Sequence, residues 1–270
     1  TLINLSGELG LGLTLPKCVP PCYCLVWIGL ELDTMDLMIR LPCDKRDRIV
    51  LFLEQWLQKK SASKGELQSL LGVLNHAASA VICGRAFTGY VIDLLREESF
   101  PVPLTDELYK DVELWLRFLQ SDMANGMRMK SPKHIPPDFL LEVAYTSNRV
   151  AIRVQDITEV FVIEDDLSES PRMLCIYAFW LAAQYASHRF PGVWLTCSVP
   201  TSADVMTVNR ARNVIKSLRP MVRHTWALQA KFDMAIRARK CDSKRDICNT
   251  VRDTFDGEIV SCNQVPEIFM

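Results

Sequence analysis

The spacing of apolar residues divides the chain into a helical part and a part rich in strands. Between residues 45 and 123, apolar side chains recur every three or four positions, which is the spacing of helices that bury one face. Ser63 and Glu66 have the S-x-x-E spacing of a capping box at the start of one of these helices. The pattern predicts helices over residues 45–60, 63–80 and 85–97, and a fourth that starts at Thr105.

Two short strands are predicted before the helices. Residues 25–32 form an apolar run that alternates at its end, where Leu30 and Leu32 share one face. Residues 39–42 form a second run, which ends at a proline that cannot continue a ladder. Residues 1–24 contain no helix of useful length, but Leu2–Leu5 or Leu11–Leu15 could form a strand.

After residue 124 the pattern changes to a period of two. Prolines and basic residues over 125–138 indicate a linker between domains. The order of elements beyond it is β-β-β-α-β-α-β-α, with Pro220 breaking or kinking the helical region 203–230. The predicted strands and helices cover residues 140–146, 150–154, 159–163, 171–187, 193–199, 203–230, 234–238 and 246–253. The fold class is therefore α+β, and the second part has the element order of the ribonuclease H fold.

Composition and charge narrow the functional classes. Hydrophobic residues make up 49% and charged residues 23% of the 270 positions, which is typical of an ordered globular protein. No apolar run reaches the roughly 18 residues of a membrane span, and the start lacks a signal-peptide layout. We expect an intracellular protein, in the nucleus or cytoplasm, with no membrane partner.

The net charge of −1 conceals a basic stretch at residues 210–245, with eleven Lys or Arg against two Asp. Such a stretch could bind the phosphates of DNA or of an RNA–DNA hybrid. The alternative is a solvated helix face that pairs with the acidic segment 156–169, which has six acids and no base. The candidate nucleic-acid contacts are Arg210, Arg212, Lys216, Arg219, Arg223, Lys231, Arg237, Arg239 and Lys240.

Ten cysteines are scattered along the chain, which favours reduced thiols over a disulfide framework. Cys18, Cys22 and Cys24 form a C-x3-C-x-C group, and Cys43 or His76 would have to complete a zinc site. The alternative is a thiol-rich loop around two prolines. We expect no bound metal and no cofactor.

The motifs between residues 25 and 87 resemble the reverse transcriptases of retrotransposons, most closely the DIRS-type elements that carry a tyrosine recombinase. The sequence WIGLELD is followed by IRLP, a helix, ELQSLLGVLN and GRAF. The resemblance covers residues 11–123 well and continues more loosely to about 255. It implies the end of a polymerase palm with a primer-grip-like hairpin (1–44), thumb/connection-like helices (45–124), a linker (125–138), a ribonuclease H-like domain (139–255) and a tail (256–270).

In that family, ribonuclease H activity needs four carboxylates that bind two divalent ions. The positions that match them here are Ser147, Cys175, Ser198 and Asn249. None is an acid, and no Y-x-D-D or F-x-D-D sequence of a polymerase centre occurs in the chain. The resemblance therefore predicts a non-enzyme whose ancestral Mg²⁺ site, RNA-directed DNA polymerase activity and hybrid-cleaving activity are lost. An active ribonuclease H would need substitute carboxylates, for which the candidates are Glu142, Asp156, Asp204 and Asp246.

Four functions follow from these observations. The first is a domesticated, catalytically inactive reverse transcriptase/ribonuclease H-like module that binds nucleic acid or acts as a scaffold. The second is a protein-interaction scaffold with no nucleic-acid role, and the third is an active ribonuclease H using the substitute acids. The fourth is a decaying open reading frame with no selected function. The hydrophobic periodicity argues against it, because the pattern is intact through all 270 residues and unconstrained decay would have introduced breaks.

Overall fold

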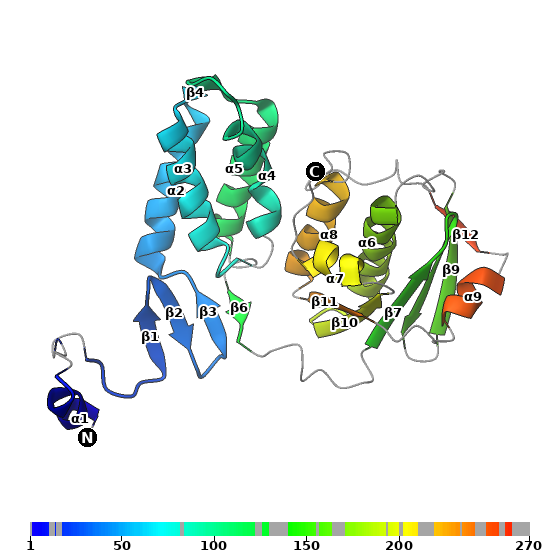
Figure 1. Ribbon diagram of the computed structural model, residues 1–270, viewed down its shortest axis with the longest axis horizontal. Coiled ribbons are helices and arrows are strands. Elements are labelled where there is room, and N and C mark those ends of the chain that lie inside the picture. The colour runs from blue at the N-terminus through cyan, green and yellow to red at the C-terminus, as the bar shows by residue number, and fades with distance from the viewer. Residues whose placement is uncertain are drawn as a thin grey trace.

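Two large hydrophobic cores organise the computed structural model, one in the helical part and one around a six-stranded sheet. Figure 1 shows the helical part beside the sheet and its helices, and the fold is mixed α+β. The structure describes residues 2–10, 14, 18–81, 84–121, 126–129, 140–154, 157–163, 171–192, 194–199, 202–209, 219–232, 234–240, 247–253 and 257–260.

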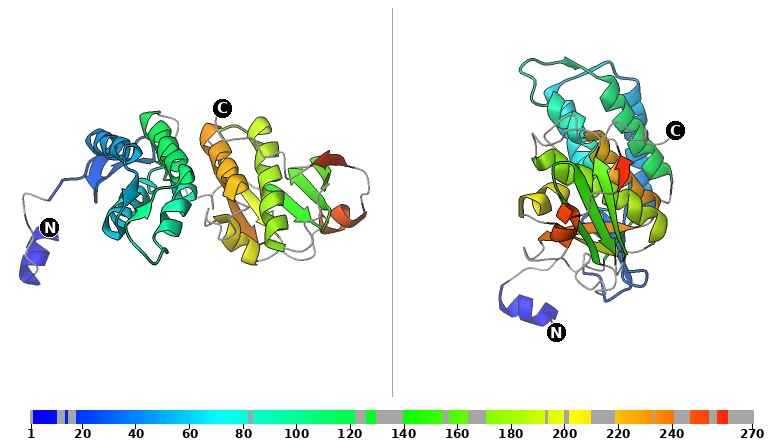
Figure 2. Two further views of the ribbon diagram at one scale, coloured as in Figure 1. Left: turned by 90° about the horizontal axis from the view of Figure 1, so that it is seen from above. Right: turned by 90° about the vertical axis from the view of Figure 1, so that its right-hand side faces the viewer.

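A short helix, α1 (Leu2–Glu8), lies at the N-terminus and stands away from the rest of the chain in both views of Figure 2. The prediction of no useful helix in residues 1–24 was therefore wrong, as was the alternative of a strand over 2–5. Most of the other proposed strand, 11–15, lies outside the described residues.

The first sheet has four strands in the order β1-β2-β3-β6. The prediction of one strand over residues 25–32 was wrong, because Ile28 and Gly29 make a tight turn in the middle of it. Their φ angles are 50° and 73°, the left-handed values of a two-residue hairpin turn. The fourth strand contains two residues that were assigned to the linker 125–138. The strands are β1 (Cys24–Trp27), β2 (Leu30–Asp33), β3 (Met38–Arg40) and β6 (Met127–Arg128).

The helical block confirms the predicted apolar periodicity. Ser63 caps the second helix, and the capping box with Glu66 is present. The predicted helix 85–97 is instead a 3-10 turn followed by a short α-helix. Two short segments of the helical block pair as β4 (Ser61–Ala62) and β5 (Val102–Pro103). The helices are α2 (Cys43–Leu57), α3 (Lys64–Ala77), η2 (Gly84–Phe87), α4 (Gly89–Leu94) and α5 (Asp106–Gln120).

Trp115 lies at the centre of the helical block and is fully buried. Its indole Nε1 donates a hydrogen bond to the carbonyl oxygen of Phe87 at 3.1 Å. Gly84 lies so close to the indole that a Cβ at that position would overlap the ring. The contact requires glycine at this point of the chain.

The second sheet has the strand order β11-β10-β7-β8-β9-β12. The first three strands in sequence form an antiparallel meander, and β10 and β11 run parallel to β7. Residues 258–260 pair with β9, so this part of the predicted tail is a strand. The strands are β7 (Leu140–Tyr145), β8 (Arg149–Val154), β9 (Ile157–Ile163), β10 (Trp194–Val199), β11 (Ala235–Lys240) and β12 (Glu258–Val260).

Helices cover both faces of this sheet. Leu141 and Val143 pack in the core that contains α6 (Pro171–Arg189), whereas Ala144 packs against α9 (Ile247–Asp253). Because successive side chains alternate across a strand, these contacts place the two helices on opposite faces. Helices α7 (Ser202–Asn209) and α8 (Arg219–Lys231) contribute to the α6 core. Pro220 lies in the first turn of α8, where a missing backbone N–H costs no helical hydrogen bond.

Candidate functional site

Four side chains form a row across the six-stranded sheet. Ser198 on β10 is the register partner of Glu142 on β7 and of Arg239 on β11. Glu142 is in turn opposite Arg153 on β8. Register partners project from the same face of a sheet, and the neighbours of Ser198 along β10 belong to the α6 core. The row Arg239–Ser198–Glu142–Arg153 therefore lies on the α9 face.

The charge of Glu142 is compensated within this row. Arg153 Nε donates to Glu142 Oε2 at 2.8 Å, and Arg153 Nη2 lies 2.7 Å from the same oxygen. Glu142 is only 8% exposed. A carboxylate at this depth requires a partner, because an unpaired buried charge is strongly unfavourable.

Ser198 is the neutral member of the row. The residue is 1% exposed, and its hydroxyl has no hydrogen-bond partner among the described residues. A hydroxyl does not carry the negative charge that Mg²⁺ prefers in its ligands.

The structure places the four predicted degenerate positions in different surroundings. Ser147 lies exposed in the bend between β7 and β8, and Asn249 is exposed on α9. Cys175 is buried in the α6 core, on the other face of the sheet from Ser198. The residue beside Ser198 in the sheet is Glu142, whereas Ser147 lies beyond the end of β7.

The other candidate metal ligands do not converge. Among the described residues, no group of three or more His, Cys, Asp or Glu side chains is placed to hold a metal ion. Cys18, Cys22 and Cys24 are exposed, and they form no such group with Cys43 or His76. His76 instead contacts Lys45 Nζ at 2.7 Å. Of the substitute carboxylates other than Glu142, Asp156, Asp246 and the side chain of Asp204 lie outside the described residues.

The basic candidates separate into three groups. Arg210, Arg212 and Lys216 lie outside the described residues. Arg237, Arg239 and Lys240 are exposed on β11, an edge strand of the sheet, and Lys231 is exposed at the end of α8. Arg219 and Arg223 are held in ion pairs with the helical block. The side chains of these two candidates are only 10% and 13% exposed.

These two ion pairs connect the two parts of the chain. Arg219 Nη1 lies 2.6 Å from Asp93 Oδ2, and Arg223 pairs with Asp111. Burial raises the pKa of Asp111 to about 7, although Arg223 and Arg219 both act to lower it. The hydrogen bond to Asp93 raises the pKa of Arg219, so this guanidinium stays charged. Sequence reasoning missed both pairs, because the partners are 126 and 112 positions apart.

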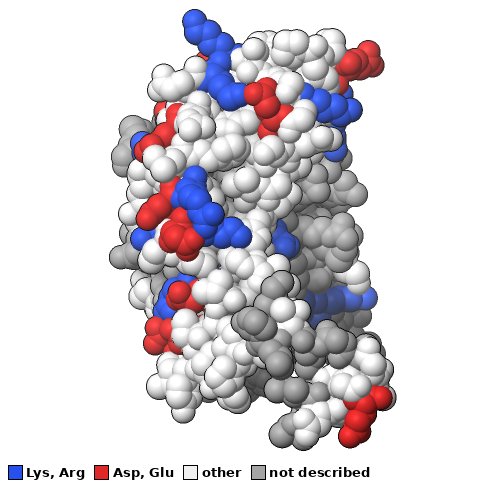
Figure 3. Space-filling model, turned by 90° about the vertical axis from the view of Figure 1, so that its left-hand side faces the viewer, with Lys and Arg blue, Asp and Glu red and all other residues white. Residues whose placement is uncertain are grey.

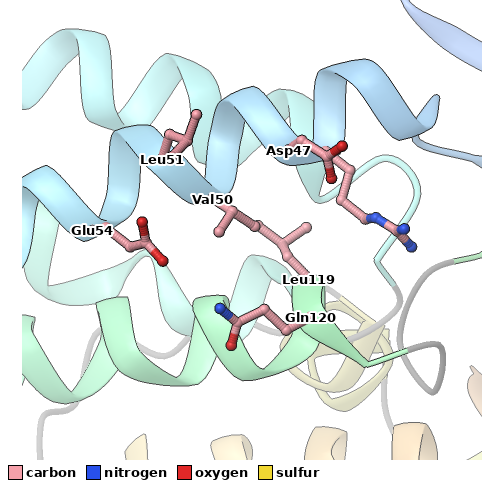
Figure 4. Close-up of a pocket in the computed structure, with 7 residues that line it drawn as sticks. Asp47, Val50, Leu51, Glu54, Leu119 and Gln120 are labelled. Atoms are coloured by element: carbon pink, nitrogen blue, oxygen red, sulfur yellow. The ribbon is translucent and has the colours of Figure 1, made fainter.

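The surface of the helical block carries charges of both signs. On the face seen in Figure 3, described Lys and Arg side chains alternate with Asp and Glu and with wide uncharged areas. A groove of about 390 Å³ lies between α2 and α5, with an apolar floor flanked by Asp47 and Glu54 (Figure 4). Its lining residues are Arg46, Asp47, Val50, Leu51, Glu54, Leu119 and Gln120.

Solved structures include a distant structural neighbour of this chain. No family model matches the sequence, and no curated protein matches it. A solved structure of the foamy viral protease-reverse transcriptase dRH in complex with double-stranded DNA is similar, with a TM-score of 0.41 and 14% identity. The match covers 91% of this chain and 42% of the viral chain, so this chain spans less than half of its neighbour's length. No helix in the described part of the chain has the length and apolar character needed to cross a membrane.

Proposed function

We propose that the chain is a retroelement-derived reverse transcriptase/ribonuclease H-like module that binds nucleic acid without catalysing its cleavage. The observation that supports this most is the row Arg239–Ser198–Glu142–Arg153. It crosses a sheet whose strand order, β9-β8-β7-β10-β11, fits the expected ribonuclease H topology. In that fold the first and fourth strands carry metal-binding acids. Here the matching residue of the fourth strand is Ser198, and the carboxylate beside it, Glu142 on β7, is paired with an arginine.

The chemistry of the row argues against hydrolysis by metal ions. Two-metal hydrolysis needs several carboxylates that converge on two cations. Glu142 alone provides little negative charge, because Arg153 already neutralises it. A divalent ion at this point would also be repelled by the guanidinium. The charges in the row are therefore balanced without a bound metal ion.

The nucleic-acid contact proposed for this module is the edge strand β11. Arg237, Arg239 and Lys240 are exposed there, and Arg239 is the end of the row. Contacts to phosphates release counterions, so binding of this kind weakens steeply as salt rises. We assign RNA–DNA hybrid or DNA as the ligand class.

A binding titration tests this function. The anisotropy of a labelled RNA–DNA hybrid would be followed at about 50 and about 200 mM salt. The variant R237Q/R239Q/K240Q is expected to weaken binding and to flatten its salt dependence. The control K60Q/K64Q/K110Q removes the same charge from exposed positions of the helical block. No binding of the unsubstituted chain at low salt, or equal losses in the two variants, would contradict the proposal.

We further propose an origin in a DIRS-type element. The residues that support this origin are the quoted motifs, which lie on β1, β2, β3, α3 and η2. The complete open reading frame would test it, because such an element places a polymerase core and a tyrosine recombinase in its coding sequence. A different gene context would contradict the origin and leave the binding proposal standing.

A protein-interaction scaffold is the second candidate function. It is favoured by apolar side chains on the hairpin, where Tyr23, Trp27 and Ile28 are 72%, 61% and 70% exposed. Clustered exposed apolar residues often mark protein-binding surfaces. A pull-down after nuclease treatment separates the two functions. Protein partners that are still captured after nuclease treatment favour the scaffold. The support is stronger if the Trp27→Ser variant no longer captures them and the Leu51→Ser variant still does.

A further inference from the structure

Helix α8 lies between the two cores of the molecule. Met221 and Val222 pack in the core of the six-stranded sheet, whereas Trp226 and Ala230 pack in the core of the helical block. Figure 1 and the left view of Figure 2 both show α8 as the part of the sheet domain nearest to α4 and α5. Arg219 and Arg223 extend from α8 into this contact.

Each arginine meets a carboxylate and an aromatic ring there. Arg219 pairs with Asp93, and its Cζ lies 5.0 Å from the centroid of the Tyr90 ring. Arg223 pairs with Asp111, and its Cζ lies 5.0 Å from the centroid of the Phe87 ring. Both guanidinium groups therefore have a carboxyl partner and an aromatic ring nearby.

Nucleic acid offers the same two partners. A guanidinium binds phosphate oxygens with charge-assisted hydrogen bonds and stacks on the flat faces of bases. Asp93 and Asp111 bind the two guanidinium groups in the way that phosphates would. Tyr90 and Phe87 lie beside the guanidinium groups, where bases would stack. The protein groups around each arginine are therefore of the same two kinds, an acidic group and an aromatic ring, that nucleic acid would provide.

The hydrogen bonding of this contact is incomplete. Arg219 Nε, Arg223 Nε and Asp111 Oδ2 are buried without a hydrogen-bond partner among the described residues. Buried polar groups that lack partners lose their hydration without full compensation. A ligand that satisfies these donors can compete with the internal carboxylates.

We propose that Asp93 and Asp111 mask Arg219 and Arg223, and that an RNA–DNA hybrid displaces these carboxylates and binds both arginines. This inference rests on the proposed nucleic-acid binding and adds its regulation. Helix α8 packs on the α6 face of the sheet, whereas Arg237 and Arg239 project from the other face, so the released arginines would add a second, separate set of phosphate contacts. The chain would then bind nucleic acid weakly while α8 is docked and more tightly once it is released.

The test compares the binding of one labelled RNA–DNA hybrid by four full-length proteins. D93N/D111N keeps side-chain size and removes both masking charges. D36N/D44N is the matched control, because it also removes two acids that pair with arginines, Arg40 and Arg48, but on exposed parts of the helical block and hairpin. The fourth protein, D93N/D111N/R219Q/R223Q, removes the unmasked arginines. D93N/D111N is expected to bind about tenfold more tightly than the control, with a salt slope steeper by about two contacts.

The outcomes separate the two proposals. A gain in D93N/D111N that is absent from the control and lost in the fourth protein supports masking. Binding by the unsubstituted chain with no gain over the control overturns masking and leaves the proposed function intact. No binding by any of the four proteins overturns both. Circular dichroism checks that each variant folds. D93N alone is the second variant, because the carboxylate of Asp93 is partly exposed. It should show part of the gain, and a folded D93N without any gain also overturns masking.

Discussion

Arg153 Nε donates a hydrogen bond to Glu142 Oε2 across β7 and β8 at 2.8 Å, and Glu142 lies beside Ser198 of β10. The charge of this buried carboxylate is therefore already balanced by a guanidinium. The proposal of an inactive module depends on this relationship, because a guanidinium would repel divalent ions bound at the same point.

Removing Arg153 should destabilise the chain by leaving Glu142 buried and unpaired. We expect R153M to lower the free energy of unfolding by about 3 kcal/mol, the lower end for partly buried pairs. E142Q/R153M should recover most of this loss, since no uncompensated charge remains. Urea unfolding of the two single variants and the double variant measures the coupling. Additive losses would show that the pair contributes nothing specific.

Rebuilding the acid pair should create a metal site only when the arginine is removed. S198D places a second carboxylate beside Glu142, and R153A removes the competing cation. A ligand that binds only the folded state raises its melting temperature. We therefore expect Mn²⁺ to raise the Tm of S198D/R153A and to leave that of S198D unchanged. A rise in the Tm of the unsubstituted chain would reveal an intact metal site and contradict the account.

The stability of the contact between the two parts should depend on pH through Asp111. Burial raises the pKa of this carboxyl from its ordinary value of 3.8 to about 7. Between these values the unfolded chain has released the proton that the folded chain retains, so stability is lost as pH rises through this window. Relative to D111N, the unsubstituted chain should lose about 2 kcal/mol between about pH 5 and about pH 8. A gain in stability relative to D111N over that pH range would mean that the arginines keep Asp111 ionised.

Two glycines should respond to alanine in opposite directions. A Cβ at Gly84 would overlap the buried indole of Trp115 and lie 3.0 Å from Ala78 Cβ, so G84A should cost about 1–3 kcal/mol. W115F makes room, and G84A/W115F should cost less than the sum of the single variants. Gly72 in α3 has open space around its Cβ position, and G72A should stabilise the chain by about 1 kcal/mol. Equal effects of G84A and G72A in chemical denaturation would contradict the described packing.

Much of the fold follows from local periodicity. The helices of the helical block and the β-β-β-α-β order were predicted because their apolar faces repeat at 3.6 or 2 residues. The turn at Ile28 and Gly29 was missed because isoleucine rarely adopts a positive φ, and no Asn-Gly signal marks it. The strand β12 was missed because it is short and pairs with a strand about a hundred positions earlier.

The candidate site was predictable only in part. Motif matching gave Ser147 and Ser198 as the positions of the first- and fourth-strand acids, whereas the residue beside Ser198 in the sheet is Glu142. The register of parallel strands depends on the connection between them, so the sequence did not show that Glu142 faces Ser198. Counting charges likewise could not show that Asp93 and Asp111 neutralise two of the arginines. Long-range pairing decides both points.

Binding without cleavage can be measured by incubating the chain with a labelled RNA–DNA hybrid and Mg²⁺ or Mn²⁺. The RNA would be recovered and sized after the bound complex is isolated at low salt. We expect a complex from which full-length RNA is recovered with either ion. The contradicting result is shortened RNA with the unsubstituted chain and full-length RNA with E142Q. Glu142 would then support catalysis, and the chain would be a working nuclease.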